Sequence, residues 1–216
     1  MNELARIYAA LLAHYGDLDW WPAKTPYEVI AGAVLTQNTA WSNVEKAIAS
    51  FDGRLSPEFI LGVSHDELAG IIRPAGFFNQ KAVYLKAVTA WYAGYGFDVQ
   101  AVQKEPLEKL HAELLAVKGV GRETADTILL YAFGFPTFVV DAYTFRLCER
   151  YPIDAGKGYE AVKAFFENSV PKDAGTYNNY HALIVINGKE HCRKKPLCNG
   201  CPLYDDCGRV GCPPGH

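Results

Sequence analysis

The sequence predicts an all-α fold with short connections between helices. Helix-start signals recur along the chain, apolar residues follow helical spacing, and no clear segment alternates with the period of two that marks a strand. The composition, 50% apolar and 21% charged, is that of a globular protein. No apolar run reaches the roughly 20 residues of a membrane span. We therefore expect one large or two small helical domains in 216 residues.

The first 20 residues, MNELARIYAALLAHYGDLDW, predict an amphipathic helix. They lack the basic start and the cleavage site of a signal peptide. We therefore expect a cytoplasmic protein.

Capping boxes predict two further helix starts, at Thr25 to Glu28, with Pro26 in the first helical position, and at Ser64 to Glu67. A short helix is predicted from Ser56. Helical periodicity predicts more helices over residues 42–51, 79–92, 106–117, 122–133, 142–150, 159–168 and 174–187. The composition changes at residues 134–136, which are the best candidate for a domain boundary.

Two predicted helices flank the turn Lys118-Gly119-Val120-Gly121. The glycines allow a tight turn and a close approach by another chain. The second helix then begins with N–H groups that have no partner within the helix, an arrangement that suits a phosphate. A plain turn between two helices explains the same residues, and the motif alone does not decide between them.

Asp141 follows an apolar run and precedes residues that favour a helix. A carboxylate at a buried helix start can stabilise a cationic sugar or orient a water molecule. It can equally serve as a helix N-cap, and the two roles can coexist.

The segments GVGRETAD and FGFPTFVVDAYTFR resemble the helix-hairpin-helix, the Gly/Pro-rich loop and the catalytic aspartate of the endonuclease III superfamily of DNA glycosylases. PYEVIAGAVLTQNT, AGFFNQKA and HALIVINGKEHC extend this resemblance over nearly the whole chain. It implies two helical domains that flank a DNA-binding groove: a six-helix barrel over residues 25–135, and a second domain from residues 1–24 and 136–216 that carries the C-terminal cysteines.

The same resemblance implies a monomer of the bacterial or archaeal nucleoid that binds double-stranded DNA containing a damaged base and flips that base into a pocket. It implies that Gln37 and Phe77 fill the gap left by the flipped base, although Gln37 could also be a helix C-cap. It assigns DNA contacts to the hairpin residues Lys118, Gly119, Val120, Gly121, Arg122 and Thr124.

Glu123 departs from the family pattern. Bifunctional members read GVGRKTA, and their lysine forms a Schiff base with the sugar and then nicks the strand. A carboxylate cannot form an imine, so we predict a monofunctional enzyme in which Lys118 contacts a phosphate. Glu123 could hydrogen-bond the base, or could be favoured by the helix dipole.

Trp20-Trp21-Pro22, the run LTQNTAW and Glu123 together resemble the endonuclease III-like 3-methyladenine DNA glycosylases. A 3-alkylated adenine is cationic and leaves easily, and aromatic rings bind it by stacking and cation–π attraction. The predicted base pocket contains Trp20, Trp21, Pro22, Trp41 and Lys189. Core packing remains the alternative for the tryptophans, as does a solvated surface position for the lysine.

Cys192, Cys198, Cys201 and Cys207 have the spacing C-x5-C-x2-C-x5-C. Four thiolates in one loop can hold a zinc ion or an iron–sulfur cluster, and the spacing alone leaves the choice open. The pattern resembles the [4Fe-4S] loop of endonuclease III, usually C-x6-C-x2-C-x5-C, and therefore implies that cofactor. Within the loop, the resemblance brings Arg193, Lys194 and Lys195 to DNA; a solvated charge run is the alternative. Cys148 is expected in the core, and Cys212 has no assigned role.

The net charge of −3 does not favour a nucleic-acid protein, but binding through backbone amides adds no charge. The leading hypothesis is a monofunctional DNA glycosylase for alkylated bases, with Asp141 and Glu123 as the candidate catalytic residues. A second is an endonuclease III-type enzyme with AP-lyase activity for oxidised pyrimidines or mismatched bases. A third is a non-catalytic DNA-binding protein, and the presence of Asp141 argues against it.

Overall fold

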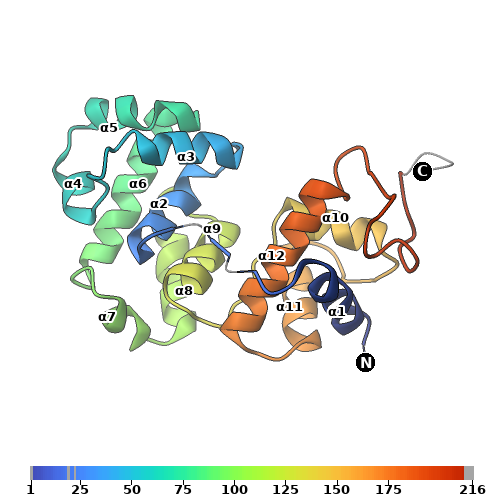
Figure 1. Ribbon diagram of the computed structural model, residues 1–216. Helices are drawn as coiled ribbons and strands as arrows, with labels where there is room; N and C mark the ends of the chain where they lie inside the picture. Colours follow the sequence, from blue (N-terminus) through green and yellow to red (C-terminus); the bar gives the residue numbers. More distant parts are fainter. Residues whose placement is uncertain (1, 19, 22, 212–216) are drawn as a thin grey trace. The chain divides into compact units, whose positions relative to one another are not determined.

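The computed structural model describes residues 2–18, 20–21 and 23–211, and these residues contain helices and no strand. The prediction of an all-α fold is confirmed. The chain divides into two compact units (Figure 1). The terminal unit contains Met1–Trp20 and Pro136–His216, and the central unit contains Trp21–Phe135.

The central unit is built around a buried helix, α2. Its elements are α2 (Pro26–Leu35), α3 (Trp41–Ala49), α4 (Pro57–Gly62), α5 (His65–Ile71), η1 (Arg73–Ala75), α6 (Phe78–Ala93), α7 (Val99–Gln103), α8 (Leu107–Ala116), α9 (Arg122–Thr127) and η2 (Ile128–Ala132). Tyr27 and every residue of α2 from Val29 to Leu35 are buried. This helix packs against α3, α6, α9 and η2, so its apolar residues face neighbours on several sides.

The predicted helix starts are present as side-chain caps. The hydroxyls of Thr25, Ser56 and Ser64 accept hydrogen bonds from the N–H groups three residues later, at 3.1, 3.2 and 3.2 Å. The carboxylate of Glu28 accepts from the N–H of Lys24 at 3.2 Å, one residue earlier than a capping box predicts.

Several predicted helix limits were wrong. The first helix ends at Tyr15, because Gly16 adopts φ +78° and donates back to Leu12. The helix predicted over 42–51 ends at Ala49, ahead of two consecutive residues with positive φ, at 52 and 53. The helix predicted over 122–133 is regular only to Thr127 and continues as a π-helical turn. Helix α7 was not predicted, because its five residues are too few to show a helical period.

The terminal unit contains α1 (Glu3–Tyr15), α10 (Ala142–Arg150), α11 (Tyr159–Ser169) and α12 (Ala174–Glu190). Helix α12 packs against α1 and α10 (Figure 1). An aromatic core lies between α11 and α12. The rings of Phe138 and Phe166 stack at 4.4 Å, and Tyr180 packs against both. The cysteine loop follows the end of α12. None of the helices described is long and apolar enough to span a membrane.

Candidate functional site

The hairpin turn lies between α8 and α9 in the central unit. Gly119 adopts φ +86°, and a Cβ on this residue would overlap the ring of Tyr84. Only glycine satisfies both the backbone conformation and the close approach. Val120 is buried and anchors the turn from below. The geometry of this turn is therefore set by the two residues at its centre.

The outer face of the hairpin is exposed at Lys118, Gly121, Arg122 and Glu123. Gly121 is the N-cap of α9, and no side chain caps the start of this helix. The first N–H groups of a helix have no acceptor within the helix, so this end offers donors to a phosphate. Thr124, which the resemblance assigns to DNA, is buried instead.

Gln37 is held by the hairpin. Its Nε2 donates to the carbonyl oxygen of Gly119 and to Oγ1 of Thr124, both at 3.0 Å. The C-cap of α2 is Thr36, so the alternative of a C-cap at Gln37 is wrong. Asn38 is exposed with φ +53°. The loop therefore presents a second amide at the surface, which the sequence analysis missed.

Phe77 is an exposed aromatic residue in a strained turn. Its side chain is 65% exposed, and it adopts φ +46° at the N-cap of α6. A bulky residue in the left-handed region costs free energy and marks a position held by its surroundings. An exposed apolar side chain on a fixed turn is suited to enter a base stack.

Three aromatic side chains meet in the central unit. The ring of Trp21 lies 5.4 Å from Trp41, edge-on, and 4.9 Å from Tyr131. Trp21 adopts φ +80°, a left-handed backbone conformation that residues other than glycine rarely adopt. Tyr131 was missed because it lies in the π-helical turn of an apolar segment. Pro22 lies outside the described residues.

Trp20 and Lys189 form a pair within the terminal unit. The ammonium of Lys189 lies 5.2 Å from the centroid of the Trp20 ring, although the lysine is exposed. This distance is that of a cation–π contact. Trp20 therefore already has a cation near its ring, whereas the described ring contacts of Trp21 are with Trp41 and Tyr131.

Asp141 is the N-cap of α10. Its Oδ1 accepts from the N–H groups of Tyr143 and Thr144 at 2.9 and 2.8 Å, and from the Thr144 hydroxyl at 3.1 Å. Its Oδ2 lies 3.6 Å from Nε2 of His181 on α12. The side chain is only 14% exposed. Three donors fix one carboxylate oxygen and leave the second beside the histidine.

The pKa of the Asp141 carboxyl lies below its ordinary value. Burial would raise this pKa, but the hydrogen bond and charge of His181 and the N–H of Thr144 outweigh it and lower it. Asp141 is therefore ionised at neutral pH. A buried carboxylate that keeps its charge is suited to stabilise a developing cation.

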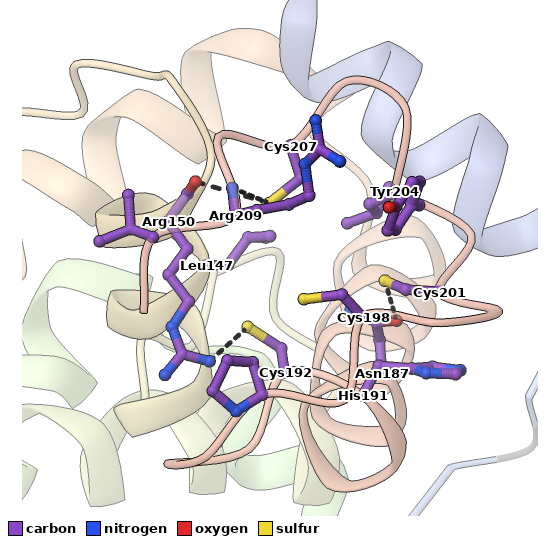
Figure 2. A pocket seen from close by; sticks show the side chains of 13 residues that line it. Leu147, Arg150, Asn187, His191, Cys192, Cys198, Cys201, Tyr204, Cys207 and Arg209 are labelled. Carbon is purple, nitrogen blue, oxygen red and sulfur yellow. Dashed lines mark hydrogen bonds between the residues drawn. The ribbon is translucent and has the colours of Figure 1, made fainter. Parts of the chain in front are cut away.

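The four loop cysteines line one pocket in the terminal unit (Figure 2). Arg150 donates to Sγ of Cys192 at 3.3 Å, and the N–H of Arg209 donates to Sγ of Cys207 at 3.4 Å. In the described part of the chain, no three Cys, His, Asp or Glu side chains converge on a position for a single metal ion. The loop cysteines and the half-buried Cys148 form no disulfide bond among the described residues, and Cys212 lies outside them.

The basic side chains of Arg193, Lys194 and Lys195 are exposed on the cysteine loop. The guanidinium of Arg150 donates to the carbonyl oxygens of Arg193 and Lys194 at 2.6 and 3.0 Å. The backbone of this charged run is thus held by α10. Its three side chains are exposed, and Nε of Arg193 donates to the carbonyl oxygen of Lys189 at 2.7 Å.

A helical fold with a glycine hairpin, and with a mostly buried, ionised aspartate at a helix start, is the arrangement that the resemblance to helix-hairpin-helix DNA glycosylases predicts. The family model described as "HhH-GPD superfamily base excision DNA repair protein" matches residues 31–172. The chain belongs to this superfamily, and it is an endonuclease III-like DNA glycosylase.

Two relatives in sequence support this assignment. The chain is 47% identical to the Methanocaldococcus jannaschii protein named "Putative DNA repair glycosylase MJ1434", with 94% of each chain covered. It is 31% identical to endonuclease III of Haemophilus influenzae, with 85% of this chain and 84% of the relative covered.

Two of the similar solved structures illustrate the likeness. One is the H. pylori 3-methyladenine DNA glycosylase bound to 1,N6-ethenoadenine, at 27% identity and a TM-score of 0.77, covering 88% of this chain and 98% of the other. The other is a non-covalent endonuclease III–DNA complex, at 24% identity and a TM-score of 0.80, covering 96% of each chain. The second likeness shows the fold alone.

Proposed function

We propose that this protein is a monofunctional DNA glycosylase that removes cationic alkylated purines, such as 3-methyladenine, by hydrolysis. The observation that carries the proposal is the aromatic group of Trp21, Trp41 and Tyr131. Flat, electron-rich rings attract a cationic base more than a neutral base of the same size. Because such a base leaves easily, the enzyme needs little acid catalysis, and no general acid has to protonate it.

Asp141 is the proposed catalytic residue. As the bond between C1′ and the base nitrogen breaks, its electron pair goes to the base and positive charge develops on the sugar. The Asp141 carboxylate stabilises that charge and orients the water that bonds to C1′. The water gives up its proton to solvent, and the products are the neutral free base and an abasic site.

The hairpin and the cysteine loop are the proposed DNA contacts. The amides at the start of α9 and the cations of Lys118 and Arg122 meet phosphates. The exposed side chains of residues 193–195 add further phosphate contacts. Phe77 and the loop that contains Gln37 fill the gap in the base stack.

The similar H. pylori enzyme supports the choice of an alkylated base. The endonuclease III relatives favour the second candidate, an enzyme for oxidised pyrimidines or mismatched bases with lyase activity. Glu123 favours the first, since the hairpin has no amine at the position that the resemblance assigns to the Schiff base.

A panel of duplexes, each with one lesion, tests the substrate class. We expect release of free 3-methyladenine about 2- to 30-fold faster than release of any oxidised pyrimidine, because a cation–π attraction of about 0.5–2 kcal/mol corresponds to a factor of this size. Free base and strand breaks are measured separately. Activity only on oxidised pyrimidines would contradict the proposal.

The same panel is run with Trp21→Leu, which should lose most of the preference for the cationic base. Trp91→Leu is the matched control. Trp91 is also a partly buried tryptophan of the central unit, but its indole N–H donates to Glu113 at 3.0 Å and it lies outside the aromatic group. Equal losses in both variants would assign Trp21 to core packing.

We also propose that the four loop cysteines hold a [4Fe-4S] cluster. The donor set fits, because four cysteine sulfurs line one pocket, and Arg150 and Arg209 direct N–H groups at two of them. A single zinc ion requires four ligands within about 2.3 Å of one point, whereas a cluster suits sulfurs that lie farther apart. When bound, the cluster would serve the structure of the loop.

Metal analysis of anaerobically purified protein tests this cofactor. We expect about four iron atoms and four acid-labile sulfides per chain, as a [4Fe-4S] cluster requires. Cys201→Ser should lower the iron content strongly, whereas Cys148→Ser, a half-buried cysteine outside the loop, should retain it. Zinc in place of iron would overturn the proposal.

A further inference from the structure

Lys81 is a buried cation on α6. Its side chain is 2% exposed, and its Nζ donates to the carbonyl oxygens of Leu35 and Ala75, both at 2.8 Å. Burial lowers the pKa of Lys81 to about 8. Burying an ammonium is unfavourable unless hydrogen bonds replace those lost to water. The charge therefore depends on these two carbonyls.

The two carbonyls belong to the ends of two helical elements. Leu35 ends α2, directly before the loop of residues 36–38. Ala75 ends η1, directly before the turn of residues 76–77. Carbonyls at a helix end carry partial negative charge and are favourable partners for a cation. Because one nitrogen bonds both oxygens, the starts of the loop and the turn are held beside each other.

The loop continues the connection to the hairpin. Gln37 donates to the carbonyl oxygen of Gly119 and to the hydroxyl of Thr124. Lys81 and Gln37 thus link three segments of the central unit: the turn with Phe77, the loop after α2, and the hairpin. Each of them carries residues to which the proposed function assigns DNA contacts.

We propose that Lys81 is a positioning residue that holds the Phe77 turn and the loop after α2 at a fixed separation, so that both enter the duplex together when a base is flipped out. The inference rests on the proposed role of these two segments. It does not depend on which damaged base the enzyme removes, or on the chemistry at Asp141.

Lys86 provides the matched comparison. It lies on the same helix, is half-buried, and donates to the carbonyl oxygens of Ile60 and Leu61 at 2.9 and 3.3 Å and also to that of Val63. These carbonyls lie at the end of α4, outside the three segments. Lys86 therefore makes the same kind of bond without holding a proposed DNA contact.

The test compares Lys81→Met with Lys86→Met, because methionine keeps most of the side-chain length and removes the charge. Single-turnover base release is measured with the lesion that the wild type removes fastest, in a duplex and in a single strand. We expect Lys81→Met to slow release from the duplex about 10- to 100-fold, since small misplacements of positioning groups have effects of this size. Release from the single strand, which needs no wedge, should change less than about threefold.

Lys86→Met should leave release from the duplex and from the single strand within about threefold of the wild type. This should hold even if its melting temperature falls as much as that of Lys81→Met. A 2-aminopurine beside the lesion reports unstacking directly, and its fluorescence rise should be slower with Lys81→Met alone. Equal losses from duplex and single strand, or an equal duplex loss in Lys86→Met, would overturn the inference.

Phe77→Ala separates this inference from the proposed function. It should slow release from the duplex, and Lys81→Met should add less in that background than in the wild type, because both changes remove the contribution of Phe77. If Phe77→Ala has no effect on duplex release, the wedge role itself is wrong and the inference is overturned with it. If the effects of Phe77→Ala and Lys81→Met on duplex release multiply, the two residues act independently. The wedge role of Phe77 would then stand, and the positioning role of Lys81 would be wrong. If Lys81→Met does not fold, Lys81→Gln is measured in its place. Its amide can still donate to one carbonyl, so it should slow duplex release by a smaller factor.

Discussion

Replacing Asp141 by asparagine should reduce base release about 10²- to 10⁴-fold while the fold and the affinity for duplex DNA remain. Asparagine is a good N-cap, so its side-chain oxygen can still accept from the N–H groups of Tyr143 and Thr144. The change removes the negative charge that faces the developing sugar cation. Single-turnover release of free base and a separate binding assay measure the two effects.

Asp173→Asn is the matched control. Asp173 caps α12, and its Oδ2 accepts from the N–H and hydroxyl of Thr176 at 2.7 and 3.0 Å, as Asp141 does with Thr144. It is exposed and has no proposed role with DNA. Both variants should change stability by no more than about 1 kcal/mol, but only Asp141→Asn should lose activity. Unchanged release in Asp141→Asn would remove this residue from the mechanism.

The lowered pKa of Asp141 adds a pH dependence with a definite sign. Its folded-state pKa lies below the unfolded value, so the carboxylate contributes stability above the unfolded pKa and loses it as the pH falls through the folded pKa. Between pH 7 and pH 5 the carboxyl stays ionised. Protonation of Asp141 should therefore not limit activity in that range.

Local sequence signals identified most of the helices and the hairpin, because their causes are local. The hydroxyls of Thr25, Ser56 and Ser64 each cap a helix through an N–H group three residues later. The turn at Gly119 needs a positive φ that glycine supplies. Such features depend on a few neighbouring residues, and a single sequence contains them.

Contacts between distant segments were not predictable in this way. Tyr131 meets Trp21 across 110 positions of the chain only because the π-helical turn packs against α2 within the central unit. His181 looks like one residue of an apolar helix, yet it faces Asp141. Lys81 looks like a surface lysine of an amphipathic helix, yet it is buried between two carbonyls. The clearest signal for Lys81 is its position on the apolar side of α6, beside Ala82 and Leu85.

Gln37 shows that a resemblance can identify a segment more reliably than the role of one residue in it. The side chain donates hydrogen bonds to Gly119 and Thr124, so both bonds would have to break before it could enter a duplex. Asn38, which is exposed and adopts φ +53°, makes no side-chain hydrogen bond among the described contacts. The resemblance therefore locates the loop, but it does not decide which side chain of the loop enters the duplex.

Wild-type protein treated with borohydride in the presence of damaged duplex DNA should form no covalent adduct. Trapping requires an amine to condense with C1′, with loss of water, and borohydride then reduces the imine to a stable amine. Glu123 is exposed on the first turn of α9, where the family's lysine would lie, and a carboxylate cannot take part. Denaturing electrophoresis of labelled DNA measures the adduct, and a trapped wild-type band would contradict a monofunctional enzyme.

Replacing Glu123 by lysine should give the enzyme the strand-cleaving activity that we expect the wild type to lack. The exposed position accepts the change at a cost of about 0.3–1 kcal/mol, because a cation replaces an anion at a helix N-terminus. We expect this variant to form a trapped adduct and to nick the strand, while Glu123→Gln, which removes the charge without adding an amine, should do neither. Should the wild type be trapped, Lys118→Ala would show whether the exposed hairpin lysine supplies the amine. An adduct in Glu123→Lys alone would mean that one side chain at the start of α9 decides between base removal and strand cleavage.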